Sequence, residues 1–200
     1  VDAQDEAAVE RHADAVAARA GGIDVALNAV GIAHVQGTAL AELSFDEFAL
    51  PLHGYTRTNF LTARAVARHM AARGRGVILT LSTPGSRMTG GGFMGYGAAC
   101  AAIEALTRHL AGELGPKGVR AVCLRSDAIP EALAAGSHTR EVFAKIAEGA
   151  GLSIDDLLAG RAAGATLLGR LPRLAEVADT AAFLASDRAS AVTAAIVNVT

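Results

Sequence analysis

A pair of hydroxyl residues and a tyrosine are the side chains of this sequence best suited to acid chemistry. Ser82 and Thr83 follow the apolar run 77–81, and Tyr96 opens a helical pattern thirteen residues after Thr83. A phenol beside a carbonyl oxygen can donate a proton to it, and a neighbouring hydroxyl can polarise it. A nicotinamide held against the carbonyl carbon would supply the hydride. These residues therefore suit the proton-handling half of a carbonyl reduction.

The elements that must position these side chains alternate between strand and helix. Apolar runs at 23–30, 77–81, 119–124 and 194–199 are typical of strands buried on both faces. Apolar periodicity predicts helices at 6–20, 44–72, 95–114, 139–150, 154–163 and 174–186. Ser44 and Glu47 form a capping box for the second helix, which Pro51 allows to be split in two. The alternation predicts an α/β fold with a doubly wound parallel sheet in one domain, residues 1–200.

The carboxyl ends of the predicted strands are where a ligand should bind. In open parallel sheets the ligand lies beyond these ends, so the residues after Leu27, Leu81 and Leu124 should meet in one site. Asn28 follows the first of these positions, and Ser82 with Thr83 follows the second.

Composition excludes several other classes of protein. The 200 residues are 52% hydrophobic, enough for one large core, and the net charge of −2 provides no basic surface for nucleic acid or an anionic membrane. Cys100 and Cys123 form no Cys-x-x-Cys pair, which argues against a disulfide scaffold and a zinc site. The six histidines are scattered, and we expect them on the surface or on helix faces. No apolar run is long enough to span a membrane and the first twenty residues are acidic, so we expect a cytoplasmic protein.

The site residues resemble those of the short-chain dehydrogenase/reductase family over nearly the whole chain. Asn28-Ala29-Val30-Gly31 stands where the family has Asn-Asn-Ala-Gly, Asn59 stands at its helical asparagine, and Thr83 and Tyr96 keep its Ser-to-Tyr spacing. The resemblance implies a Rossmann-like fold, a small carbonyl or alcohol substrate, NAD or NADP, and a homodimer or homotetramer. It implies catalytic roles for Tyr96, Thr83, Ser82 and Asn59, and cofactor contacts for Asp2, Asn28, Ala29, Val30, Gly31, Cys100, Asp127 and Ile129.

The sequence also departs from the family pattern. Cys100 replaces the lysine of Tyr-x-x-x-Lys, and Ser126-Asp127 replaces a Pro-Gly pair. An ammonium about 5 Å from a phenolate would contribute about 3 kcal/mol, or about two pKa units, at an effective dielectric constant near 20. Its loss should impair alcohol oxidation most. Residues 1–200 contain no Gly-rich phosphate turn. We therefore expect the family's first βαβα portion to precede Val1 and a short segment to follow Thr200.

Two functions stay open at this point. The retained tyrosine, asparagines and hydroxyls favour an NAD(P)-dependent oxidoreductase that interconverts a carbonyl and an alcohol, with Tyr96 as the proton donor. The missing lysine and the Asp127 carboxylate favour a catalytically impaired relative that acts as a binding or interaction module. The residues specify neither the substrate nor the choice between NAD and NADP.

Overall fold

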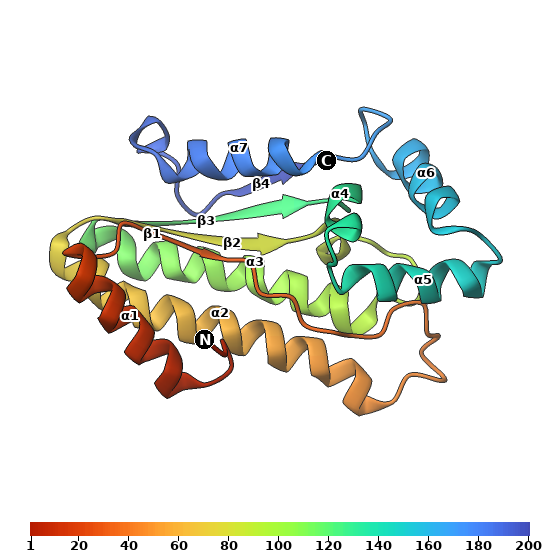
Figure 1. The fold of residues 1–200 in the computed structure, drawn as a ribbon, viewed down its shortest axis with the longest axis horizontal. Coiled ribbons are helices and arrows are strands. Elements are labelled where there is room, and N and C mark those ends of the chain that lie inside the picture. Colours follow the sequence, from red (N-terminus) through yellow and green to blue (C-terminus); the bar gives the residue numbers. More distant parts are fainter.

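A four-stranded parallel sheet forms the middle layer of the protein. The computed structural model describes all of residues 1–200 (Figure 1). The strands are β1 (Val25–Asn28), β2 (Gly76–Ser82), β3 (Val119–Ser126) and β4 (Ile196–Val199), and they lie side by side in that order. Leu27 pairs with Leu79, and Leu79 pairs with Val122. The strands therefore end together at one edge of the sheet.

Helices cover both faces of the sheet and one end of it. One face carries α1 (Glu6–Ala20), α2 (Phe45–Arg73) and α3 (Met94–Leu114), and the other carries α7 (Leu174–Ala185). Three helices, α4 (Pro130–Ala134), α5 (Thr139–Ala150) and α6 (Ile154–Ala165), lie beyond the carboxyl ends of the strands (Figure 1). Single 3-10 turns occupy Pro84–Ser86, Gly115–Lys117 and Asp187–Ala189. The predicted α/β class and doubly wound parallel sheet are thus confirmed. None of the helices is both long and apolar enough to cross a membrane.

The long helix α2 is continuous, although Pro51 allowed a break. Its start is fixed by the predicted capping box, in which Ser44 Oγ accepts from Glu47 N–H at 3.3 Å and a Glu47 carboxylate oxygen accepts from Ser44 N–H at 2.9 Å. Pro51 lies inside the helix and is buried. A proline removes one backbone hydrogen bond. The contacts of α2 with α3, α1 and the sheet outweigh that loss, so a single helix forms.

Strand boundaries differ from the sequence predictions because of strand pairing, and one short helix was not predicted. The first strand was predicted over 23–30, but β1 covers only Val25–Asn28, because only these residues pair with β2. The third strand extends beyond its predicted end to Ser126, because β4 provides partners for Arg125 and Ser126. The short helix α4 was not predicted, since five residues contain too little apolar periodicity to reveal it.

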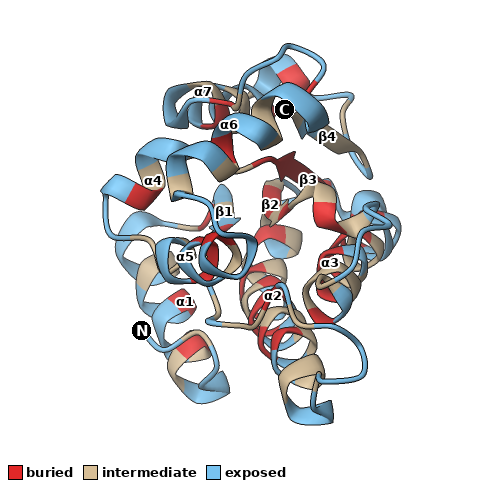
Figure 2. Cartoon of the chain, turned by 90° about the vertical axis from the view of Figure 1, so that its right-hand side faces the viewer, coloured by how far each residue is buried: buried red, intermediate tan, exposed pale blue.

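Two apolar clusters hold the layers together. Side chains of α1, α2 and α3, including Leu61 and Met70, pack on one face of the sheet around Ile78. On the opposite face, Leu79 and Leu124 pack against α7. Buried residues accordingly gather on the strands and on the helix faces turned toward them (Figure 2). This packing fixes the strand ends that carry the polar side chains.

The packing predicts a large loss of stability when Leu79 is truncated. Leu79 lies in β2 and is 1% exposed. We expect Leu79→Ala to lower the free energy of unfolding by about 2–5 kcal/mol, measured by urea denaturation. Leu168→Ala is the control, because Leu168 is 69% exposed and its truncation should change stability by less than about 0.5 kcal/mol. Equal effects of the two variants would contradict the assignment of Leu79 to the core.

Candidate active site

A cavity of about 450 Å³ lies at the carboxyl ends of β1, β2 and β3. Residues of α3, α4, α5, α6 and α7 line the rest of it. The residues predicted for the site that line it are Asn28, Ala29, Val30, Gly31, Asn59, Ser82, Thr83, Tyr96, Cys100, Asp127 and Ile129. Asp2 does not line the cavity. It is exposed near the start of the chain, where its Oδ1 accepts from Gln4 N–H at 2.9 Å, and its cofactor role stays a prediction.

Tyr96 reaches the cavity from the first turn of α3. Burial raises the pKa of its phenol well above the usual range, and the neighbouring Cys100 and Tyr55 raise it further. Cys100, one helical turn later, is 3% exposed, and burial also raises the pKa of its thiol. The position that follows Tyr96 by one turn therefore holds an uncharged thiol. Tyr96 is accordingly suited to donating a proton and poorly suited to accepting one.

Thr83 supplies a second hydroxyl beside Tyr96. It caps the turn after β2, where its Oγ1 accepts from Gly85 N–H at 3.2 Å. The same oxygen lies 3.4 Å from Cys100 Sγ. Both Thr83 and Tyr96 line the cavity, so a carbonyl group bound there can meet the two hydroxyls together.

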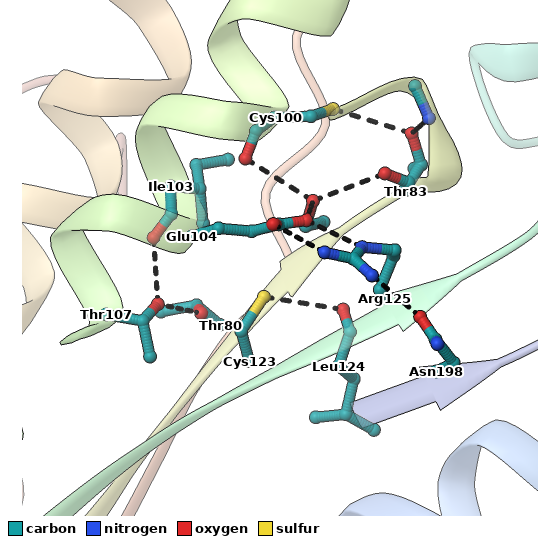
Figure 3. Close-up of polar contacts among 12 residues, drawn as sticks. Thr80, Thr83, Cys100, Ile103, Glu104, Thr107, Cys123, Leu124, Arg125 and Asn198 are labelled. Carbon is teal, nitrogen blue, oxygen red and sulfur yellow. Dashed lines mark hydrogen bonds and ion pairs between the residues drawn. The ribbon is translucent and has the colours of Figure 1, made fainter. Parts of the chain in front are cut away.

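The neighbouring Ser82 is engaged below the cavity by a buried ion pair. Ser82 Oγ donates to Glu104 Oε1 at 2.8 Å. Arg125 donates to the same carboxylate from Nε at 2.8 Å and from Nη2 at 2.6 Å, and its Nη1 donates to Asn198 Oδ1 at 2.9 Å (Figure 3). Because the Ser82 proton is used by Glu104, Thr83 is the hydroxyl that is better placed to contact a ligand.

The charge of Glu104 is stabilised by its partners. Burial alone would raise the pKa of the carboxyl, but hydrogen bonds from Arg125 and Ser82 outweigh burial and hold the pKa below its usual value. The bidentate contact with Glu104 raises the pKa of Arg125 in turn. The pair therefore stays ionised and ties α3 to β3 and β4 directly beneath the cavity.

An unpredicted histidine stacks on Tyr96. The ring centroids of His34 and Tyr96 are 4.2 Å apart and their planes differ by 8°. His34 Nδ1 lies 2.7 Å from the carbonyl oxygen of Ile32, and its Nε2 lies 2.7 Å from Gln36 Nε2. A neutral ring with its proton on Nδ1 satisfies both contacts. Burial lowers the pKa of His34, which agrees with this form. The expectation of surface or helix-face histidines is thus wrong for His34, because its loop folds back over α3.

Two buried amide atoms at the cavity have no hydrogen-bond partner. They are Asn28 Nδ2 and Asn59 Oδ1. Asn28 uses only its Oδ1, which accepts from Val30 N–H at 3.3 Å, and Asn59 uses only its Nδ2, which donates to the Tyr55 carbonyl at 2.9 Å. A buried unpaired donor or acceptor is costly, so both atoms suit a ligand with hydroxyl or carbonyl groups. A nicotinamide nucleotide carries such groups on its ribose and carboxamide. No group of three or more His, Cys, Asp or Glu side chains is placed to hold a metal ion.

Asp127 enters the cavity as one half of an ion pair. Its side chain is 1% exposed, and its Oδ1 accepts from Arg161 of α6 and from Ala128 N–H at 2.6 Å. The guanidinium compensates the carboxylate charge. Asp127 therefore does not place an uncompensated negative charge where a nicotinamide would lie.

Sequence reasoning missed several residues of the site and its surroundings, among them His34, Glu104, Arg125 and Arg161. Glu104 had a usable signal, because it follows Tyr96 by eight residues and thus lies on the same face of α3. The other three depend on contacts between distant segments. No local pattern marks such contacts.

The comparisons with known proteins find a family model that matches the whole chain and relatives named as dehydrogenases. A family model described as enoyl-(acyl carrier protein) reductase matches residues 1–200. (+)-Borneol dehydrogenase 1 of Salvia officinalis is 31% identical over 192 residues, which are 94% of this chain and 68% of that protein. Sorbitol-6-phosphate 2-dehydrogenase of Klebsiella pneumoniae is 31% identical over 140 residues, which are 70% of this chain and 51% of that protein.

The fold is also similar to that of solved dehydrogenase structures. The crystal structure of sorbitol-6-phosphate 2-dehydrogenase from Erwinia amylovora superposes with a TM-score of 0.87 at 26% identity, over 100% of this chain and 76% of that one. The chain therefore spans between about half and three quarters of the length of these relatives.

The ion pair between Glu104 and Arg125 predicts that removing one charge destabilises the protein more than removing both. Arg125→Met leaves Glu104 charged and unpaired, so we expect the free energy of unfolding to fall by about 3–5 kcal/mol in urea at neutral pH. The double variant Glu104→Leu/Arg125→Met removes both charges and should lose less than Arg125→Met alone. A double variant that is less stable than Arg125→Met would show that the unpaired charge of Glu104 is not what destabilises Arg125→Met.

Proposed function

Because the chain belongs to the short-chain dehydrogenase/reductase family, we propose that the protein interconverts a carbonyl compound and an alcohol by hydride transfer with NAD or NADP. The observation that carries this proposal is the meeting of Tyr96, Thr83 and Asn59 at one cavity. The dehydrogenase names of the relatives support it.

In the proposed reaction Tyr96 donates the proton. A reduced nicotinamide, when bound at this site, would supply the hydride to the carbonyl carbon. Thr83 donates a hydrogen bond to the carbonyl oxygen, which draws electron density from the carbon. As the oxygen gains negative charge, it becomes more basic than a phenolate and takes the proton of Tyr96. The raised pKa of Tyr96 keeps this proton in place until that moment. These features favour reduction over oxidation.

Several residues at the strand ends are proposed to hold the cofactor. The unpaired Nδ2 of Asn28 fits an acceptor oxygen of the nucleotide, beside the backbone of residues 29–31. Asp127 and Ile129 border the place proposed for the nicotinamide. Asn59 supports the site through its unpaired Oδ1, which fits a water or a ligand hydroxyl. Cys100 provides an uncharged wall of this place.

A second function is favoured by Cys100. Alcohol oxidation needs Tyr96 as a phenolate, and no positive charge near Tyr96 lowers its pKa. A protein that binds the cofactor without efficient turnover would fit this environment. The two functions differ in whether the bound cofactor is consumed.

We further propose that the protein is a cytoplasmic homodimer or homotetramer that pairs through α2 and α3. The resemblance to the family supports this assembly. Phe60, on the outer side of α2, is 51% exposed and would be covered in such a pair.

Removal of the proposed acid tests the reaction. We expect Tyr96→Phe to lower the rate of carbonyl-dependent NAD(P)H oxidation by about 10²–10⁴-fold, because the ring remains and the proton-donating hydroxyl is lost. The rates are measured on the natural full-length protein. Cofactor binding, measured by fluorescence titration, should stay within about twofold of wild type and serves as the control. An unchanged rate would rule out Tyr96 as the proton donor.

Restoring a positive charge tests the direction of the reaction. In Cys100→Lys an ammonium near the phenol should lower the pKa of Tyr96 and raise the rate of alcohol oxidation by at least about tenfold. Cys100→Met adds a long side chain without charge and is the matched control. If Cys100→Met and Cys100→Lys oxidise alcohols at the same rate, the missing charge is not what limits oxidation.

A further inference from the structure

A second cavity adjoins the proposed active site. It has a volume of about 250 Å³ and lies between α5, α6 and the loop before α3. It shares Phe93, Phe143 and Arg161 with the cavity that holds Tyr96. These shared residues place the two cavities next to each other, with Phe93, Phe143 and Arg161 at the boundary between them. In Figure 1 these two helices stand at the end of the molecule toward which β2 and β3 point.

The lining of this second cavity is mainly apolar. Six residues line this second cavity and not the active-site cavity: Ile146, Leu152, Asp156, Leu157, Leu158 and Gly160. Phe143 and Leu158 belong to a small buried cluster that joins α4, α5 and α6. The walls are therefore held by packing within the described helices.

The charged side chains at this cavity already have partners within the chain. The Asp156 carboxylate accepts from Ser153 Oγ at 2.7 Å in the cap of α6. Arg161 pairs with the buried carboxylate of Asp127. An anionic ligand would have to compete with Asp127 for Arg161. A polyol would find few free side-chain partners and would lose hydrogen bonds to water on entering.

We propose that the cavity between α5 and α6 is a subsite for the apolar part of the substrate. The preferred substrate is then a carbonyl compound or alcohol with an alkyl or alicyclic portion of several carbons, rather than a polyol or a phosphorylated sugar. This inference rests on the proposed function, because it places the reacting carbonyl at Tyr96. Apolar burial supplies the affinity, since each methylene buried strengthens binding by about fourfold.

Gly160 offers a way to fill the subsite with little strain. A Cβ atom built at Gly160 meets nothing within 4 Å, although the residue lines the cavity. Gly160→Leu therefore adds a side chain beside the open space. Gly164→Leu is the matched control, because Gly164 lies on the same helix, also has nothing within 4 Å of its Cβ, and lines neither cavity.

The experiment uses methyl ketones of increasing length, from butan-2-one to undecan-2-one, with the full-length protein. In wild type we expect the Michaelis constant to fall by about fourfold for each methylene until the subsite is full. In Gly160→Leu the Michaelis constant for undecan-2-one should rise at least about tenfold, while that for butan-2-one stays within about twofold of wild type. Gly164→Leu should behave like wild type. Calorimetric binding of undecan-2-one, measured without turnover, should weaken by the same factor in Gly160→Leu.

The outcomes separate this inference from the proposed function. Ketone binding that weakens in Gly160→Leu without turnover by either cofactor would support the subsite and reject the reaction. Turnover whose Michaelis constant does not depend on chain length would support the reaction and overturn the subsite. A preference for phosphorylated or carboxylated carbonyls, lost in Arg161→Leu, would also overturn the subsite, since Arg161 would then bind the substrate.

Discussion

The parallel pairing of β1, β2 and β3 determines where the functional groups of this chain lie. Each strand carries its polar residues just after its apolar segment, and parallel register brings these carboxyl ends to one edge. Asn28, Ser82 with Thr83, and Asp127 meet there although they are distant in sequence. The helices α2 and α3 complete the site, because their packing on the sheet delivers Asn59 and Tyr96 to the same cavity. Loss of the register would therefore disperse the site.

The charges around the cavity are compensated in pairs. Glu104 is neutralised by Arg125, and Asp127 is neutralised by Arg161. His34 is neutral and Cys100 is an uncharged thiol, so no net charge acts directly on the Tyr96 phenol. In such surroundings burial dominates the behaviour of the phenol and holds its proton. This electrostatic balance makes the site suited to proton donation. It is also why the absence of a lysine beside Tyr96 should impair alcohol oxidation more than carbonyl reduction.

Much of the fold was predictable because it depends on local patterns. The alternation of short apolar runs with amphipathic segments predicted the parallel sheet, and the predicted helix at residues 139–150 coincides with α5. The gathering of Asn28 and Thr83 followed from the rule for strand ends, and Tyr96 was placed with them by its family-like spacing from Thr83. The stack of His34 on Tyr96 and the contact of Arg161 with Asp127 depend on loops that fold over the sheet, and periodicity carries no information about such contacts. The partner of Glu104 was hidden for the same reason, although its position on the face of Tyr96 was visible.

Titration of the two tyrosines tests most directly whether Tyr96 is a retained acid. Residues 1–200 contain two tyrosines and no tryptophan, so the ultraviolet absorbance of this chain reports the ionisation of Tyr55 and Tyr96. Burial raises the pKa of both phenols. We predict that no tyrosinate signal develops below pH about 10 in the folded protein. A phenol that ionises between pH about 7 and 9 would contradict this prediction, because Tyr96 would then have a positive neighbour and would act as a base.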